Sequence, residues 1–278
     1  MKFSIIMPSF NQKRFIERSI QSVLRQSYNN FELIIVDGAS TDGTHEILDK
    51  YRHHCSKVLI EPDNGQSDAL NKGFSLASGD VFGWLNSDDI YEPGAFQLAA
   101  AAFESHKNIK VFFGDWNDID ENDRVIQRRH AFDFSTKHHL YEGFHCNSQA
   151  MFWRKPVHRR FGKFDLKLHR TMDYEMILSF GENETDRSFL RTDTVLAGFR
   201  QHESQKTRGM DAKVIAEHKY IAEKHSVSHK FSRRGRWLHR LYRLRRFRWY
   251  VKRAGLGYAL KKIIGSAAAK RFLTVFRA

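Results

Sequence analysis

Two adjacent carboxylates, Asp88 and Asp89, follow the apolar run "VFGWL" at residues 81–85. Carboxylate oxygens are the ligands that hard cations such as Mn²⁺ and Mg²⁺ prefer, and such ions need only one or two of them when phosphate oxygens complete the shell. A bound cation neutralises the negative charge on a departing phosphate group. This pair at the end of a buried strand therefore predicts a metal site that also holds a diphosphate ligand.

Two more predicted strands end in polar residues. The first, over 3–8, ends at Pro8 and Ser9, and the second, over 31–37, runs into "VDGASTDGT" with Asp37 at its tip. Ligands of open parallel sheets bind outside the carboxyl ends of the strands. Each loop alone has an ordinary alternative, since Asp-Gly is a common turn and Ser, Thr and Asp cap helices. The three loops together favour one shared binding crevice.

The elements that must position these side chains follow from hydrophobic periodicity. Strands are predicted over 3–8, 31–37, 57–61 and 80–86, alternating with helices over 14–26, 43–54, 66–77 and 94–106. This alternation is typical of an α/β fold with a parallel sheet covered by helices on both faces. Further strands are predicted over 109–116, 149–155 and 194–202, and a helix over 173–180.

Composition divides the chain unevenly. The 278 residues are 41% hydrophobic, enough for a large core, and the two cysteines are too far apart for a redox motif, which suits a reducing compartment. We recognise no signal peptide and no apolar run long enough to cross a membrane. Residues 231–278 hold 15 Lys and Arg and no acidic residue, whereas the rest is nearly neutral. We expect a domain over 1–205 and a basic helical extension over 206–278.

The extension contains an amphipathic pattern in "RWLHRLYRLRRFRWYVKR", residues 236–253. An apolar face with Trp237 and Leu244, opposite an arginine face, is typical of a helix that lies on an anionic membrane. Binding to nucleic acid, or packing of the helix on the protein or a partner, are the alternatives. We expect the membrane surface and no nucleic acid.

The quoted motifs resemble those of a known family. "SIIMPSFNQKRFIERSIQSVLRQSYNNFELIIVDGASTDGT", followed by "LNSDD", is similar to the inverting family 2 glycosyltransferases with the GT-A fold. The resemblance covers roughly residues 1–205 and is nearest to bacterial members that extend surface polysaccharides such as O-antigen. It implies transfer of a sugar from a nucleoside diphosphate donor, with UDP favoured, to an acceptor hydroxyl, with inversion of the anomeric centre.

The resemblance also implies roles for residues that bind the donor and the metal. Asp37 would contact the base, Pro8 and Ser9 the base and ribose, Asp88 the ribose and metal, and Asp89 the metal. Asn86 stands where the family often has Asp, so it adds no charge. The segment "EPDNGQSDALNKGF" resembles a donor-side segment, in which Asp68 would contact the donor and Lys72 would balance its charge; a solvated helix start is the alternative.

The base and a third metal ligand follow from the same resemblance. Inverting transfer needs a carboxylate to accept the acceptor's proton. Asp173 in "TMDYEMIL" occupies that position, with Met172 in place of the common Glu and Glu175 as the second choice. His202 in "FRQHES" would coordinate the metal. His145, Ser148 and Gln149 in "HCNSQAMFWRK" would touch the acceptor or the donor sugar.

These expectations combine into a metal-dependent, inverting glycosyltransferase that uses Mn²⁺ or Mg²⁺ and acts on a lipid-linked saccharide at the cytoplasmic face of the membrane. One alternative is another sugar-nucleotide enzyme of GT-A-like fold. The other is an adaptor that binds membrane or nucleic acid through the basic extension without catalysis. A Walker A loop, a G-x-G-x-x-G fingerprint and a glycine-rich pyrophosphorylase-type loop are all absent from the sequence.

Overall fold

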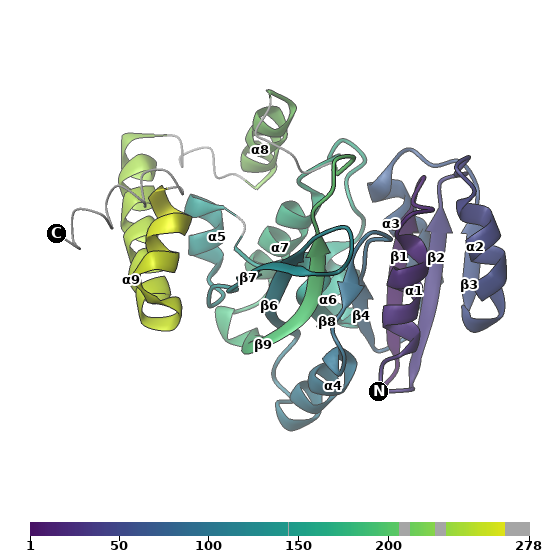
Figure 1. The fold of residues 1–278 in the computed structure, drawn as a ribbon. Coiled ribbons are helices and arrows are strands. Elements are labelled where there is room, and N and C mark those ends of the chain that lie inside the picture. The colour runs from purple at the N-terminus through teal and green to yellow at the C-terminus, as the bar shows by residue number, and fades with distance from the viewer. Residues whose placement is uncertain (144, 206–211, 226–231, 265–278) are drawn as a thin grey trace.

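The computed structural model describes residues 1–143, 145–205, 212–225 and 232–264. Its centre is a nine-stranded sheet in the order β3-β2-β1-β4-β8-β6-β9-β5, with β7 paired to β6 (Figure 1). The strands are β1 (Phe3–Ser9), β2 (Phe31–Asp37), β3 (Lys57–Ile60), β4 (Val81–Trp84), β5 (Ile90–Tyr91), β6 (Val111–Ile119), β7 (Val125–Arg129), β8 (Met151–Arg154) and β9 (Phe189–Arg200).

Helices flank this sheet. They are α1 (Ile16–Leu24), α2 (Thr44–Tyr51), α3 (Gln66–Leu76), α4 (Ala95–Ser105), α5 (Thr136–Glu142), α6 (Lys155–Phe161), α7 (Met172–Asn183), α8 (Ala212–Lys224) and α9 (Arg233–Ile264). Short 3₁₀ turns occur at Arg52–His54, Ser148–Ala150 and Asp186–Ser188. The predicted α/β class with helices on both sides of the sheet is confirmed.

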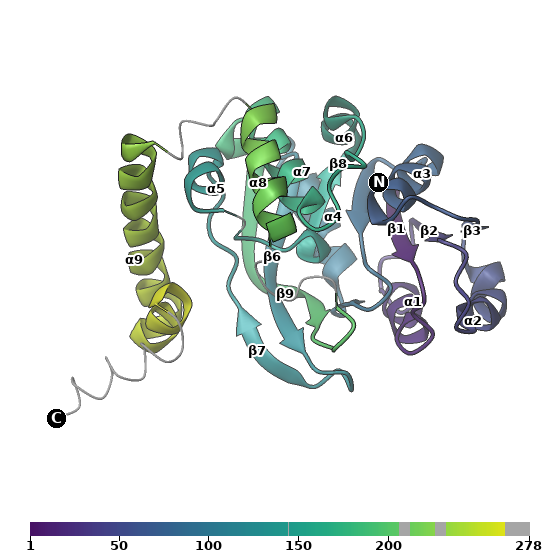
Figure 2. The ribbon, with the colours of Figure 1, turned by 90° about the horizontal axis from the view of Figure 1, so that it is seen from above.

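The N-terminal half of the sheet is parallel and doubly covered. β1 pairs in parallel with β2 on one side and β4 on the other. Because successive strand residues point to opposite faces, Ile5 packs with the cluster under α1 and α4, whereas its neighbour Ile6 packs with the cluster under α3 and α7. Figure 2 shows α1 and α2 on one side of β1 and β2 and α3 on the other. Burial on both faces explains the continuous apolar runs.

The second half of the sheet is mixed. β8 is antiparallel to both β4 and β6, while β6 runs parallel to β9. The three strands predicted here are present, although β9 begins at Phe189, five residues before the predicted start. The elements β5, β7, α5 and α6 were not predicted. β5 has only two residues, and β7 exposes Val125 and Ile126, so neither carries the pattern of a buried strand.

The residues after 205 include two helices packed on the rest of the protein. Ile221 of α8 lies in the main core, and α9 lies beside α5 (Figure 1). A left-handed Gly255, with φ of 83°, separates α9 into two helical segments. The boundary predicted near residue 205 adjoins 206–211, which lie outside the described residues, so the two-part division stays a prediction. Among the described residues, no helix is both long and apolar enough to cross a membrane.

Candidate active site

Two adjoining cavities lie near the carboxyl ends of the strands. The first, which we call the β1 cavity, has a volume of about 570 Å³ and is lined by residues that include Pro8, Gly38 and Asp88. The second, the α7 cavity, has a volume of about 500 Å³ and includes Asp173 in its wall. Gln66, Asn86 and Phe199 line both cavities. Molecules bound in the two cavities would therefore meet across these three side chains.

The three strand ends from which a crevice was predicted lie next to one another in the sheet. Ser9 at the end of β1 is in register with Asp37 at the end of β2, and β4 lies on the other side of β1. Pro8, Ser9 and Asp88 all line the β1 cavity. Of the three predicted loops, those after β1 and β4 thus contribute predicted ligand-binding side chains directly.

Asp37 lies beneath this cavity instead of lining it. Its side chain is fully buried and accepts hydrogen bonds from the backbone N–H and hydroxyl of Ser40, at 2.8 and 2.7 Å. His45 Nε2 lies 3.0 Å from Asp37 Oδ1, the oxygen that also accepts the backbone N–H of Ser40. Asp37 therefore closes the turn between β2 and α2. The predicted direct contact with a nucleotide base does not fit this geometry, because its oxygens already have partners inside the protein.

Asp63, and not Asp37, is the carboxylate that lines the β1 cavity beside Gly38. A side chain at Gly38 would place its Cβ 2.6 Å from Asp63 Oδ2, so the glycine leaves room for this carboxylate. Asp63 lines the β1 cavity and accepts a hydrogen bond from the backbone N–H of Gly65 at 2.8 Å. Asp63 was not predicted from the sequence, because the donor contact of the segment "EPDNGQSDALNKGF" was assigned to Asp68.

Asp88 and His202 form a pair at the edge of the β1 cavity. His202 Nε2 lies 2.9 Å from Asp88 Oδ2, and its other ring nitrogen lies 2.9 Å from Ser204 Oγ. The Arg200 side chain donates to the backbone carbonyl of Asp88 at 2.6 Å, which fixes the loop. Two of the three residues predicted as metal ligands thus come together from positions 114 apart in the chain.

Asp89 has a different place. It is 1% exposed, and its two oxygens accept hydrogen bonds from the backbone N–H of Arg200 at 2.8 Å and from Asn86 Nδ2 at 3.2 Å. Burial, together with the nearby charge of Asp88, raises the pKa of Asp89 well above its usual range. The predicted role of Asp89 as an open metal ligand therefore does not fit this structure; it joins β9 to the loop after β4.

Asn86 connects the two cavities. Its side-chain oxygen accepts hydrogen bonds from Gln66 Nε2 and Trp84 Nε1, both at 2.7 Å, and its backbone N–H donates to Gln149 Oε1 at 2.6 Å. Asn86 Oδ1, the oxygen expected to contact a ligand, thus already accepts two hydrogen bonds within the protein. Asn86 lines both cavities but holds their dividing wall in place.

The predicted donor contacts Asp68 and Lys72 lie outside both cavity walls. Asp68 accepts a hydrogen bond from the backbone N–H of Asn64 at 3.0 Å. Lys72 pairs with Glu61 at 2.8 Å and donates to the carbonyl of Pro62 at 2.9 Å. Both side chains therefore shape the loop that carries Asp63, in place of the direct ligand contacts that the sequence suggested.

Asp173 lies in the first turn of α7 and lines the α7 cavity. Its Oδ1 accepts the backbone N–H of Tyr174 at 2.7 Å. Burial raises the pKa of Asp173 to about 6, which suits a carboxylate that must accept a proton near neutrality. Glu175, the second choice, faces α8, where Lys224 Nζ lies 3.0 Å away. Only Asp173 of these two acids reaches a cavity.

The three residues expected near the transferred sugar or acceptor all line the α7 cavity. They are His145, Ser148 and Gln149. His145 is 9% exposed, and burial followed by the charge of Arg246 holds its pKa well below the usual range. The imidazole of His145 is therefore neutral and lies next to the charged Arg246.

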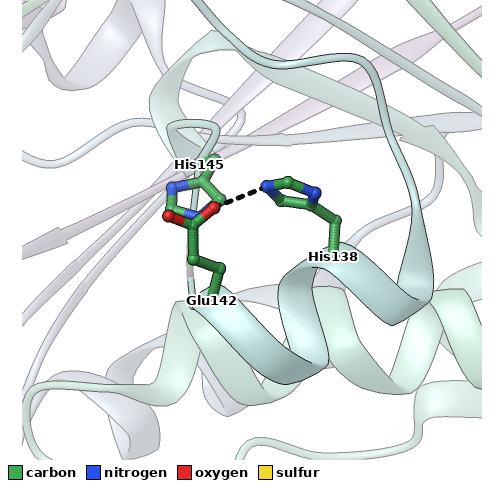
Figure 3. Close-up of side chains that lie close together, drawn as sticks. All are labelled: His138, Glu142 and His145. Carbon is green, nitrogen blue, oxygen red and sulfur yellow. Dashed lines mark ion pairs between the residues drawn. The ribbon is translucent and has the colours of Figure 1, made fainter. Parts of the chain in front are cut away.

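His145 also belongs to a buried cluster with His138 and Glu142 (Figure 3). His138 Nε2 lies 2.7 Å from Glu142 Oε2, and Arg246 Nη2 donates to Glu142 Oε1 at 2.7 Å. These three groups have the types and spacing of a metal site. Arg246 already supplies the positive charge that balances Glu142, so the cluster acts here as the anchor of α9.

Several residues of the α7 cavity were not predicted to be site residues from the sequence. They are Gln66, Asp118, Arg129, Asn147, Arg170, Gln201, Arg246, Tyr250 and Lys262. The last three come from α9, in the basic extension, which the sequence analysis assigned to a membrane surface and not to the site. These residues reach the cavity only because the extension packs on the rest of the protein. The sequence shows that the extension is basic but does not show where it packs.

A family model described as "Glycosyl transferase family 2" matches residues 4–162. The matched segment contains all of the parallel half of the sheet and the loops that carry Ser9, Asp63 and Asp88. It ends before α7 and therefore before Asp173.

Curated relatives match over part of their length. A PGL/p-HBAD biosynthesis glycosyltransferase of Mycobacterium bovis is 28% identical over 186 residues, which are 62% of this chain and 67% of that protein. An uncharacterized glycosyltransferase of Nostoc sp. is 31% identical over 131 residues, 46% of this chain. The match spans only 40% of the Nostoc protein.

Solved structures resemble the whole fold. S. aureus TarS 1-349 in complex with UDP-GlcNAc has a TM-score of 0.61 at 19% identity, covering 95% of this chain and 82% of that one. The mannosyltransferase PcManGT of Pyrobaculum calidifontis, in complex with GDP-Man and Mn²⁺, has a TM-score of 0.56 at 16% identity, covering 99% and 79%. The predicted GT-A architecture is confirmed by this likeness.

Proposed function

Because this chain belongs to glycosyl transferase family 2, we propose that it transfers a sugar from a nucleoside diphosphate sugar to an acceptor hydroxyl, with inversion of the anomeric centre. The observation that carries the proposal is the pair of adjoining cavities. Asp88, which is bonded to His202, lines one cavity, Asp173 lines the other, and three side chains belong to both. This arrangement suits a donor and an acceptor that react at the shared wall.

The β1 cavity is the proposed donor site. Pro8 and Ser9 line it at the end of β1, and Gly38 and Asp63 line it next to them. The carboxylate of Asp63 suits an acceptor of hydrogen bonds from the N–H groups of a base or the hydroxyls of a ribose. A UDP-sugar is our first choice of donor, supported by the likeness to TarS solved with UDP-GlcNAc.

Asp88 and His202 fit a divalent cation. A carboxylate oxygen and an imidazole nitrogen lie 2.9 Å apart at the cavity edge, and Ser204 fixes the ring of His202 through its second nitrogen. Mg²⁺ takes oxygen ligands almost exclusively, so an imidazole favours Mn²⁺. When bound there, the cation would neutralise the charge that builds on the leaving diphosphate. The likeness to two fold relatives solved with Mn²⁺ supports this choice.

Asp173 is the proposed general base. Its carboxylate faces the α7 cavity, where the acceptor hydroxyl would lie, and it would take the hydroxyl proton as the oxygen attacks. Its position at the start of α7 favours the ionised form through the helix dipole, while burial opposes ionisation. Gln149 and Asn86 hold the wall that separates this carboxylate from the β1 cavity.

The acceptor we propose is a lipid-linked saccharide in the synthesis of a cell-surface polysaccharide. The outer face of α9 supports a location on an anionic membrane, because Trp237, Leu244 and Val251 recur every seven residues and all are exposed. Arginines flank this apolar stripe on the helix surface. Two of the alternatives from the sequence, an adaptor without catalysis and binding of nucleic acid, do not account for the two cavities.

A screen of nucleotide sugars tests the proposal. The full chain is incubated with UDP-, GDP- and dTDP-sugars with Mn²⁺, and release of the nucleoside diphosphate is measured by chromatography. We expect slow hydrolysis of one donor class that requires the cation and is lost in Asp88→Asn. Failure of every donor to react or to raise the melting temperature of the protein would overturn the proposal.

A further inference from the structure

The C-terminal helix α9 forms one wall of the α7 cavity. Arg246, Tyr250 and Lys262 line the cavity from this helix, opposite Asp173 and Ser148. A basic extension that had only to bind a membrane would have no reason to complete the cavity that holds the proposed base. Its contribution indicates a direct role in recognising what binds there.

Specific contacts fix α9 in this place. Arg246 Nη2 donates to Glu142 Oε1 at 2.7 Å, and Trp249 Nε1 donates to Asp133 Oδ2 at 2.8 Å. The hydroxyl of Tyr258 accepts the backbone N–H of His130 at 3.1 Å.

The bend of α9 then returns its last turns to the same wall. The chain turns at Gly255, and Arg243 donates to the carbonyl of Ile263 across the bend. The bend therefore brings Lys262 back to the cavity wall that Arg246 also lines.

Cations outnumber acids in this cavity. Arg129, Arg170, Arg246 and Lys262 line it, whereas its acidic side chains are Asp118 and Asp173. Arg129 pairs with Asp118 through Nε at 2.6 Å, and Arg246 pairs with Glu142 beneath the wall. Among the described residues, no hydrogen bond or ion pair is made by the amine of Lys262.

Lys262 has no hydrogen bond or ion pair to the described residues, and the nearby charge of Asp118 compensates its ammonium only in part. Burial, followed by the charge of Arg129, lowers the pKa of Lys262 to about 8. A buried cation that is repelled by neighbouring cations costs free energy unless an anion pairs with it. The cavity wall thus presents the half-buried ammonium of Lys262 beside the guanidinium groups of Arg129 and Arg246, each of which is paired with one acid of the protein.

We infer that this cationic wall binds a phosphate group of the acceptor. The inference rests on the proposed function, because it assigns the acceptor to the cavity of Asp173. Guanidinium forks bind phosphate oxygens in pairs of hydrogen bonds, and a lysine adds a point charge. Arg246 Nε is buried without a hydrogen-bond partner in the described part of the chain, which leaves unused donor capacity on this wall.

The donor's diphosphate does not account for these cations. In the proposed donor site it would lie in the β1 cavity, with its charge balanced at Asp88 and His202. Arg129, Arg246 and Lys262 do not line that cavity. They belong to the wall of the α7 cavity, so they suit a second phosphate that arrives with the acceptor. The phosphate either joins the saccharide to its lipid carrier or is part of the saccharide.

Lys262→Gln is the decisive variant, since the change breaks no ion pair between Lys262 and the described residues. Lys261→Gln is its matched control, because Lys261 is adjacent and exposed, and its amine donates to Gln127 Oε1 at 3.3 Å, its one hydrogen bond to the described part of the chain. Lys262→Arg keeps the charge. Binding of n-octyl phosphate and glucose 1-phosphate to the full chain is measured by calorimetry without divalent cation and at constant ionic strength.

We expect Lys262→Gln to weaken binding of the phosphate ester about tenfold or more, while Lys261→Gln and Lys262→Arg stay within about threefold of the wild type. Tighter binding of octyl phosphate assigns the phosphate to a lipid carrier, and tighter binding of glucose 1-phosphate assigns it to the saccharide. Equal affinity of Lys262→Gln and wild type, or no binding of either probe, would overturn the inference.

A parallel measurement separates this inference from the proposed function. UDP with Mn²⁺ should raise the melting temperature of Lys262→Gln as much as that of the wild type, because Lys262 does not line the β1 cavity. Loss of phosphate binding with this response intact supports the inference. If neither protein responds to UDP, GDP or dTDP with Mn²⁺, the proposed function fails, whatever the phosphate result.

Discussion

His202 Nε2 lies 2.9 Å from Asp88 Oδ2, which joins the segment after β9 to the loop after β4 at the edge of the β1 cavity. The side chain of His202 is 1% exposed and that of Asp88 is 18% exposed, so the pair is open on the aspartate side. A cation that enters from the cavity would meet the carboxylate first. In the proposed metal site both residues supply a ligand atom, and the cation reaches the site from the side of Asp88.

Replacing Asp88 should separate cation binding from folding. In Asp88→Asn the carboxylate charge is lost with little change in size. We therefore expect the apparent affinity for UDP in the presence of Mn²⁺ to fall tenfold or more. Thermal unfolding at increasing UDP and Mn²⁺ measures this. Asp49→Asn, at an exposed position on α2, is the control and should respond as the wild type. An unchanged response of Asp88→Asn would remove Asp88 from the metal site.

Asp89 should behave as a structural residue. In Asp89→Ala the backbone N–H of Arg200 and the amide of Asn86 lose their acceptors, so we expect the free energy of unfolding to fall by about 1–3 kcal/mol. Urea denaturation measures the loss. Folded Asp89→Ala protein should still be stabilised by UDP and Mn²⁺. If the variant is as stable as the wild type but is no longer stabilised by UDP and Mn²⁺, Asp89 is a metal ligand after all.

Asp173→Asn should abolish transfer without abolishing donor binding. The amide cannot accept the acceptor's proton, so we expect the rate of transfer to fall by about 10²–10⁴. The UDP response should remain, because Asp173 lines the α7 cavity and not the β1 cavity. Glu175→Gln is the comparison. It breaks the contact with Lys224 and should reduce stability more than it reduces the rate per folded molecule.

The raised pKa of Asp173 predicts two opposite pH effects. Transfer should rise as pH increases through about 6, because only the ionised carboxylate accepts a proton. Stability should change in the other direction: the folded protein binds this proton more tightly than the unfolded chain, so ionisation of Asp173 costs stability as pH rises from about 4 to 6. Asp173→Asn should remove this cost, about 1–3 kcal/mol at neutral pH. Rate–pH profiles and urea denaturation at pH 5 and 7.5 check both effects.

The outer face of α9 should bind membranes. Trp237→Glu with Leu244→Glu places charge in the exposed apolar stripe, and we expect binding to anionic liposomes to fall at least tenfold in a sedimentation assay. Tyr242 and Tyr250, which are buried on the docked face, are unchanged, so phosphate and UDP binding should persist. Equal sedimentation of variant and wild type would refute the membrane assignment.

The fold could be predicted largely because its signals are local. The runs that form β1 and β2 are buried on both faces, and α1 keeps Ile16, Ile20 and Val23 on one face, so periodicity identifies them. β5 and β7 depend on pairing with distant strands and have no such pattern.

The site was harder to predict because a strand-end carboxylate can face the cavity or the protein. Asp37 is held by Ser40 and His45, and Asp89 by Arg200, whose backbone lies 111 positions away in the sequence. Which carboxylate is taken up internally depends on those donors, so sequence alone could not distinguish Asp88 from Asp89. Lys262 was beyond reach for the same reason, since its place depends on the docking of α9.

The most direct test of the account is the position of the cation in crystals grown with Mn²⁺ and UDP, located by anomalous scattering at the manganese edge. We predict a single strong peak that contacts both Asp88 and His202, with UDP oxygens completing its shell. A peak bound to Asp89, or one at His138, Glu142 and His145, would contradict the assignment of the donor site.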